Sequence, residues 1–327
     1  MNFLALLLGL GVERMLTHLF HLREFRWLNP FFDWAFGKLA RTSRWVAAGG
    51  IIVVTCVAIF PVSVVALLLQ GTLADIPYFV FAVIVLLFCL GPHDLLDEGN
   101  DFCEAINKGD LVKARDLAKD IVEDCEFDSD GGLSKVDAAV YVQANNRIFS
   151  VVFWFVVLGP LGAWLFRTVD LMRHRATSEL PRLSHEATQR ITIGSIDGAT
   201  LAIFYLHGVL AWLPSRLLIL GYMLAGSFDG AIVGARAYFA QSAHLVSHLS
   251  TDILSWVGRG AVGQELLIDA IESEGLDSEL TGSAEEIPLF AIVAAERALS
   301  AVNLVRRTLW LIWCPTLAIL TLTDWLF

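Results

Sequence analysis

The sequence predicts an all-α, polytopic membrane protein with four to five membrane segments, including broken or re-entrant helices, together with cytosolic helices. Hydrophobic residues make up 56% of the chain and charged residues only 17%, a balance that soluble chains of 327 residues rarely show. Apolar runs with few or no charges recur at 46–69, 76–92, 148–166, 199–228 and 308–323. About 20 apolar residues cross a bilayer core, so each run is a candidate membrane segment.

The first 92 residues are expected to form an interfacial helix followed by two transmembrane helices. Residues 3–20 mix charges, among them Glu13, with apolar residues at helical spacing, as in a helix that lies at the membrane surface. Basic residues cluster before the run at 46–69, whereas the connection at 70–75 has none. The positive-inside rule therefore predicts a cytoplasmic N-terminus.

Two polar segments, 93–147 and 229–307, are expected to be cytosolic and helical. The first carries 14 acidic and six basic residues. Within it, Gly109 is expected to end one helix and Asp110 to cap the next. The second segment predicts helices at 228–248 and 288–307 and leads into a final transmembrane helix at 308–327.

The region 148–228 is expected to hold broken membrane helices, because two of its apolar runs contain a proline. Gly159 and Pro160 interrupt the run at 148–166, and Pro214 interrupts the run at 199–228. A re-entrant hairpin at each break would keep the basic residues from Arg167 onward on the cytoplasmic side, in agreement with the positive-inside rule. Proline-kinked helices that cross fully, giving five conventional spans, are the alternative.

Polar residues at these ends and breaks are the candidate ligand site. Arginine at membrane depth is costly, and its natural partners are phosphate and carboxylate groups. Structural interpretations remain open: Asp94 can cap a helix, and Arg216 can pair internally with Glu13, Asp94, Asp170 or Asp229. The candidate ligand-binding residues are Glu13, His93, Asp94, Asn145, Asn146, Arg147, Gly159, Pro160, Arg167, Pro214, Arg216 and Asp229. No catalytic residue and no metal ligand is predicted.

Several motifs, taken in chain order, resemble the AmpE family of bacterial inner-membrane proteins. They are Gly91-Pro92-His93-Asp94, Ala144-Asn145-Asn146-Arg147, Phe153-Trp154-Phe155, Leu158-Gly159-Pro160-Leu161-Gly162-Ala163, Trp212-Leu213-Pro214-Ser215-Arg216 and Ala225-Gly226-Ser227-Phe228. The resemblance implies membership of the wider AmpE and CobD/CbiB superfamily. Its cobalamin branch joins an aminopropanol unit to cobyric acid with ATP, and its AmpE branch is associated with β-lactamase regulation and cell-wall signalling.

The chain departs from the cobalamin branch at the positions that would hold a nucleotide and a metal. Where that branch has Gly-Asp-Pro after its first helix, this sequence reads Gly9-Leu-Gly-Val-Glu13, and the stretch 201–207 has no carboxylate. We therefore expect an inner-membrane regulatory protein of the AmpE type that binds an anionic ligand in a polar cavity open to the cytoplasm. Its expected partners are the bilayer, that ligand and a protein on the cytosolic face, and nucleic acid is not among them.

The alternative is a membrane-embedded, ATP-dependent enzyme of the CobD/CbiB type that forms an amide bond. Such an enzyme would need ATP and Mg²⁺, held by carboxylates such as Glu13, Asp94 and Asp229. Carboxylates that converge in the cavity would favour the enzyme. Arginine and amide groups alone would favour a binding protein.

Overall fold

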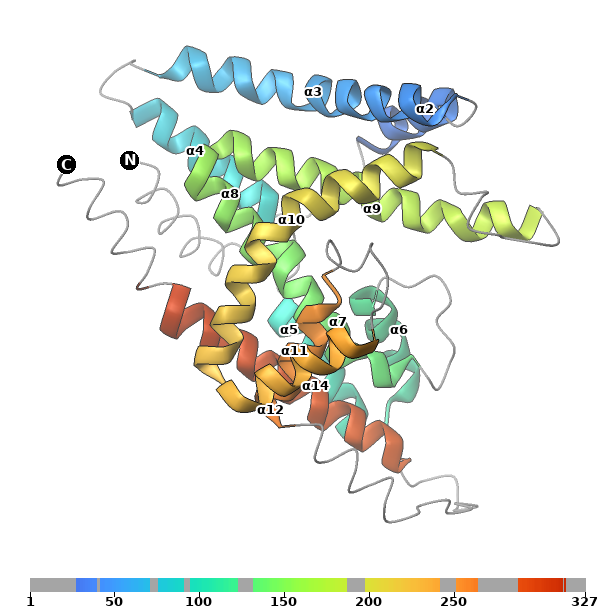
Figure 1. The fold of residues 1–327 in the computed structure, drawn as a ribbon, viewed down its shortest axis with the longest axis vertical. Coiled ribbons are helices and arrows are strands. Elements are labelled where there is room, and N and C mark those ends of the chain that lie inside the picture. Colours follow the sequence, from blue (N-terminus) through green and yellow to red (C-terminus); the bar gives the residue numbers. More distant parts are fainter. Residues whose placement is uncertain are drawn as a thin grey trace. The chain divides into compact units, whose positions relative to one another are not determined.

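The structure is a computed structural model that describes residues 28–39, 42–70, 76–90, 95–122, 132–186, 198–241, 251–263, 288–313 and 315. All regular elements in these ranges are helices, which confirms the all-α prediction (Figure 1). The chain divides into two compact units. Unit 1 comprises Met1–His93 and Asn146–Pro214, and unit 2 comprises Asp94–Asn145 and Ser215–Phe327.

Unit 1 contains the first two apolar runs as helices. Helix α3 (Arg44–Leu69) follows the short α2 (Asn29–Leu39), and α4 (Ile76–Leu90) comes next. The central helix of the unit is α9 (Pro160–Glu186), which packs on α3, α4 and α8 (Ser150–Leu158). The indole Nε1 of Trp164 in α9 donates to the carbonyl oxygen of Ala58 in α3 at 3.0 Å, which ties these two helices together.

The chain turns back on itself between α8 and α9. Helix α8 ends at Leu158, Gly159 has φ 68° and ψ −153°, and α9 begins at Pro160. A Cβ atom on Gly162 would collide with the carbonyl oxygen of Trp154, so the two helices cross at the distance of bare backbone. The predicted break at Gly159-Pro160 is thus confirmed, and the return of this hairpin to the cytoplasmic side stays a prediction.

Replacing Gly159 with alanine is expected to lower the free energy of unfolding by about 1–3 kcal/mol, because its dihedral angles are accessible almost only to glycine. Thermal unfolding of the purified protein in detergent measures the change. Gly37→Ala is the control, since nothing lies within 4 Å of a Cβ atom there. Equal unfolding temperatures for the two variants would contradict a strained turn.

The predicted break at Pro214 is wrong. Helix α10 runs without interruption over Gly198–Ala225, with Pro214 inside it. A proline removes one backbone hydrogen bond and crowds the preceding turn, but a long apolar helix can absorb that local cost when its remaining bonds and side-chain packing are kept. The proline-containing through-helix, which the sequence left as the alternative, is the structure that forms.

Unit 2 is a bundle of shorter helices around α14 (Leu289–Thr308), which packs on α5 (Leu95–Asn107), α7 (Val136–Gln143) and α12 (Ile253–Val262). Helices α6 (Leu111–Val122) and α11 (Phe228–Gln241) also belong to this unit. The face of α14 in the core carries small residues, which allow close packing: Ala291, Ala294, Ala295, Ala298 and Ala301.

Local predictions for unit 2 are confirmed where the structure describes the residues. Gly109 has φ 76°, and Asp110 Oδ1 accepts a hydrogen bond from the amide of Lys113 at 3.0 Å, which caps α6. The helices expected from 288 and from 228 begin at Leu289 and Phe228. Residues 242–250, the end of the second of these predicted helices, lie outside the described residues.

The helix that enters the third apolar run begins earlier than expected. A single helical segment covers Leu133–Leu158, so Arg147 is not a helix boundary. Among the described residues, four helical segments are long and apolar enough to cross a membrane: Arg44–Leu69, Ile76–Asn107, Leu133–Leu158 and Gly198–Ala225. The chain is therefore a multi-pass membrane protein. Most of the final predicted segment, 308–327, lies outside the described residues.

Candidate functional site

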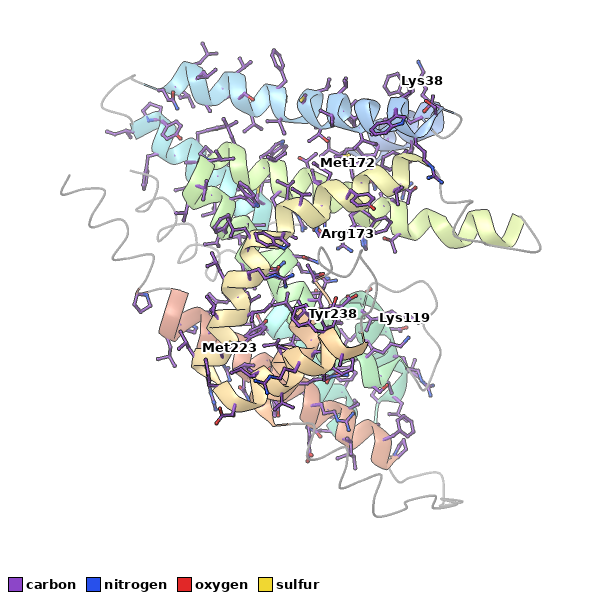
Figure 2. All side chains as sticks on the ribbon, in the orientation of Figure 1. Lys38, Lys119, Met172, Arg173, Met223 and Tyr238 are labelled. Atoms are coloured by element: carbon purple, nitrogen blue, oxygen red, sulfur yellow. The ribbon has the colours of Figure 1, made fainter. Side chains whose placement is uncertain are left out.

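In unit 1, three ionisable side chains surround the carboxylate of Asp170. We call Asp170 and these three, Arg167, Arg173 and His207, the Asp170 cluster. Arg167 Nη1 donates to Asp170 Oδ2 at 3.2 Å. Arg173 donates to Asp170 Oδ1 through Nη2 at 3.0 Å and through Nε at 3.3 Å. His207 Nε2 lies 3.4 Å from the same Oδ1. Figure 2 labels Arg173 among the side chains of unit 1.

The sequence positions explain how the cluster forms. Arg167, Asp170 and Arg173 are spaced three residues apart on α9, so one helix face presents them together. His207 comes from α10, where its ring lies 5.6 Å from the Phe166 ring, centroid to centroid. Arg167 is among the predicted site residues, whereas Arg173 and His207 are not. The i, i+3 repeat was the available signal for Arg173.

The Asp170 cluster is buried. The exposed fractions of the side chains are 8% for Asp170, 7% for His207, 13% for Arg167 and 18% for Arg173. The guanidinium groups of Arg167 and Arg173 both contact the carboxylate of Asp170. Nε of Arg167 is also buried and makes no hydrogen bond within the described part of the chain. The arrangement can accept one more anionic group.

The pKa of Asp170 reflects the same balance of charges. Helix α9, which carries Asp170, is not among the four candidate spans. Burial alone would raise the pKa of this carboxyl, but the charge of Arg173, the contact with His207 and the charge of Arg167 outweigh it and hold the pKa well below its ordinary value. Asp170 is thus ionised at neutral pH and neutralises only part of the arginine charge.

The predicted residues Asn145, Asn146 and Arg147 lie in an irregular turn of helix. Ala144–Phe149 forms a π-helical turn between α7 and α8. Asn145 is 0% and Asn146 2% exposed, and Arg147 is partly exposed. Wide turns of this kind are frequent at functional sites, because they turn side chains away from the regular helical positions.

The first backbone amides of α9 make hydrogen bonds within the α8–α9 turn. The amide of Gly162 donates to the carbonyl oxygen of Gly159 at 3.1 Å, and the amide of Ala163 donates to the same oxygen at 3.4 Å. Gly159 and Pro160 themselves are buried. The first turn of α9 uses these two donors, so the amides of Gly162 and Ala163 are not free to bind an anion.

The other predicted residues are divided between the units or lie outside the described residues. Arg216, half-buried on α10, belongs to unit 2 and interacts electrostatically with Tyr238 of α11. Asp170, one of its suggested partners, belongs to the cluster in unit 1, and Asp229 is exposed at the start of α11. Pro214 is buried inside α10. Glu13, His93 and Asp94 lie outside the described residues.

Unit 2 has its own buried ion pair, which the sequence did not indicate. Arg259 donates to both oxygens of Asp137, through Nε and through Nη2, at 2.7 Å each. Asp137 is 1% exposed, and its hydrogen bond raises the pKa of Arg259 despite partial burial. This fork joins α12 to α7. Both oxygens of the carboxylate are occupied by one guanidinium, so we assign the pair a structural role.

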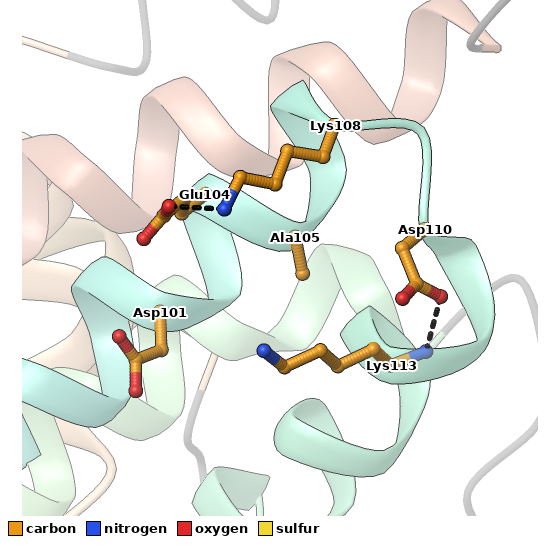
Figure 3. A pocket seen from close by; sticks show the side chains of 6 residues that line it. All are labelled: Asp101, Glu104, Ala105, Lys108, Asp110 and Lys113. Atoms are coloured by element: carbon orange, nitrogen blue, oxygen red, sulfur yellow. Dashed lines mark hydrogen bonds and ion pairs between the residues drawn. The ribbon is translucent and has the colours of Figure 1, made fainter.

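Two hollows occur on the described surface of unit 2. The smaller, of about 70 Å³, is lined by Asp101, Glu104, Lys108, Asp110 and Lys113 (Figure 3). Lys108 pairs there with Glu104, so its charges are largely paired on a solvated surface. The larger is a polar groove of about 340 Å³. Among the described residues, no three His, Cys, Asp or Glu side chains gather in a way that could hold a metal ion.

One comparison with known proteins matches a family over most of the chain. The model of the family described as "Regulatory signalling modulator protein AmpE" matches residues 1–273. The chain is 25% identical over 181 residues to the cobalamin biosynthesis protein CobD of Stutzerimonas stutzeri (strain A1501), which covers 52% of each chain. It is 27% identical over 186 residues to the cobalamin biosynthesis protein CobD of Chromobacterium violaceum, covering 56% of this chain and 54% of the relative.

The chain spans about half the length of the curated relatives that it matches. No solved structure matches it significantly. The family match, in contrast, covers most of the chain, including the α8–α9 turn, the Asp170 cluster and all of α10. The chain therefore belongs to the AmpE family of regulatory signalling modulator proteins.

Proposed function

We propose that this protein is a signalling protein of the bacterial inner membrane that regulates β-lactamase induction in response to cell-wall state, and that it detects an anionic ligand at the Asp170 cluster. The observation that carries the proposal is a buried carboxylate contacted by two arginines, one of which, Arg167, has a buried Nε that makes no hydrogen bond within the described residues. Family membership supports the regulatory role. In this proposal the N-terminus is cytoplasmic, and the cluster receives its ligand from that side.

The ligand proposed here carries a carboxylate or phosphate group. Both fit the planar fork of a guanidinium, and both would replace water around Arg167 and Arg173. Asn146 and Arg147, which precede α8 in the same unit, are proposed to contribute polar contacts. Arg216 and Asn145 are proposed as a separate polar region of unit 2 rather than as members of one shared site.

Arg167→Gln is expected to weaken the binding of the anionic ligand by about tenfold or more, because a hydrogen bond to a charged group contributes about 1.5–3 kcal/mol. Native mass spectrometry of the detergent-purified protein measures the retained anion. In cells with an inducible β-lactamase, the induced activity should change in the same variant. Arg175→Gln is the matched control, since Arg175 lies on the same helix and pairs with exposed Asp33.

Equal ligand retention and equal induction in the Arg167 and Arg175 variants would refute the cluster as the sensing site. A change in β-lactamase induction without a change in bound anion would support the regulatory role and contradict ligand binding at the Asp170 cluster. Thermal unfolding of each variant separates both results from misfolding.

A second candidate function is ATP-dependent amide formation, which the two relatives named for cobalamin biosynthesis favour. It would require a nucleotide and Mg²⁺ close to carboxylates such as Glu13, Asp94 and Asp229. Release of ADP or phosphate from ATP by the purified protein, dependent on Mg²⁺ and on an added amine and carboxylic acid, would establish it.

A further inference from the structure

The polar groove of unit 2 lies where three helices end or begin. Gly226 and Ser227 link α10 to α11, Val262 ends α12, and Ser300, Asn303 and Arg307 follow one face of α14. Its volume of about 340 Å³ is at the lower end of the range of about 300–1,000 Å³ that holds small ligands. None of the described residues that line it is acidic.

The groups that line the groove are arranged to donate hydrogen bonds. Asn303 Oδ1 accepts a hydrogen bond from Arg306 Nη2. This leaves the amide N–H groups of Asn303 to donate to a ligand in the groove. Ser227 Oγ accepts from the amide of Gly230 at 3.2 Å, which leaves its hydroxyl proton for a ligand. Within the described part of the chain, no hydrogen bond or ion pair engages the guanidinium of Arg307. A ligand that satisfies these donors is rich in acceptors and anionic.

The sequence neighbours of the groove are exposed and apolar. Leu224 and Phe228, on either side of the 225–227 link, are 70% and 55% exposed. Trp310 and Leu311, just after Arg307, are 58% and 67% exposed. Ala225 ends a candidate membrane span, and the apolar run 308–323 follows Arg307 directly. Tryptophan and arginine beside apolar segments are typical of the level of the lipid headgroups.

We infer that this groove binds a phosphate group, and that its occupant is the headgroup of an anionic phospholipid whose acyl chains lie against the neighbouring apolar side chains. Arg307 supplies the charge, and Ser227, Ser300 and Asn303 supply hydrogen bonds to the phosphate oxygens. This site is separate from the Asp170 cluster, and it does not depend on the function proposed above.

The test is lipid binding by the full-length protein in detergent, titrated with phosphatidylglycerol and followed by native mass spectrometry. Arg307→Gln is expected to weaken phosphatidylglycerol binding about tenfold or more. Ser300→Asp, which places a carboxylate in the groove, should weaken it as well. Arg236→Gln is the matched control, because Arg236 is an exposed arginine on α11 of the same unit and does not line the groove. Unfolding temperatures confirm that each variant is folded.

Two further probes separate the sources of the phosphate. Phosphatidylcholine should bind more weakly than phosphatidylglycerol, since it carries no net negative charge. Binding of soluble glycerol phosphate that is lost in Arg307→Gln, without binding of phosphatidylglycerol, would support the phosphate site and assign it to a soluble ligand. Equal losses in the Arg307 and Arg236 variants, or no binding of either phosphate compound, would overturn the inference.

Discussion

Replacing Asp170 with asparagine is expected to lower the free energy of unfolding by about 3–5 kcal/mol, the usual cost of removing one partner from a buried charge pair. The substitution preserves shape but leaves Arg167 and Arg173 with no carboxylate between them in a buried place. Thermal unfolding in detergent can follow this, with a thiol-reactive fluorophore reporting on Cys89 and Cys103, which are buried and free in the folded protein.

A matched control for this prediction is the ion pair between Asp33 on α2 and Arg175 on α9. Asp33 pairs with Arg175 in two hydrogen bonds of 2.9 Å, yet Asp33 is 47% exposed. Water screens such a pair, so Asp33→Asn should change stability by less than about 1 kcal/mol. If Asp170→Asn cost no more than this control, the two arginines would have to be neutralised by other groups, and Asp170 would not be their main partner.

The same carboxylate predicts the direction of a pH effect. The pKa of Asp170 is lower in the folded protein than the ordinary carboxyl value of 3.8, so folding favours the ionised form. Its contribution is complete above that ordinary value and is lost as the pH falls below it. Wild-type protein should therefore lose more stability than the Asp170→Asn variant between neutral and strongly acidic pH.

Gly230→Ala is the second large effect that we expect, with a loss of about 3 kcal/mol, the upper part of the usual range for overpacking. Helices α11 and α12 cross so closely that a Cβ atom on Gly230 would collide with the carbonyl oxygen of Gly260, and one on Gly260 with the carbonyl oxygen of Gly230. Backbone atoms cannot rotate away as a flexible side chain can. The helices would have to separate, with loss of the hydrogen bond from Ser227 N to Ala261 O at 2.7 Å.

Gly49→Ala is the control for this substitution, because Gly49 lies in the middle of α3 with nothing within 4 Å of a Cβ atom. Its stability should change by no more than about 0.5 kcal/mol. An unfolding temperature for Gly230→Ala within error of Gly49→Ala would show that α11 and α12 separate readily. The close crossing would then not contribute to the stability of unit 2.

The sequence was most informative where a single local property decides the structure. Uncharged runs at 46–69 and 76–92 became helices α3 and α4, because length and hydrophobicity leave few alternatives. The turn at Gly159 followed from a glycine directly before a proline. The prediction of a helix break at Pro214 was wrong because the free-energy cost of a proline inside a helix is local. The remaining hydrogen bonds and packing of α10 offset this cost.

Burial of polar residues was the information that the sequence could not supply. The uncharged run begins at residue 148, directly after Arg147, yet Asn145 and Asn146 are buried within a continuous helix. Only part of the Asp170 cluster could be predicted from the sequence. Arg167 and Arg173 follow from helical spacing, whereas His207 reaches Asp170 only when α10 packs beside α9.

That division between near and distant partners has a consequence for how α9 folds during synthesis. The three charged residues of α9 can pair as soon as this helix forms, before α10 exists, since their contacts are internal to one helix. At a synthesis rate of roughly 5–20 residues per second, His207 follows Asp170 after roughly 2–7 s. During that interval the arginines of the helix are already partly neutralised by Asp170, so burying them costs less free energy when a neighbouring helix arrives to cover them.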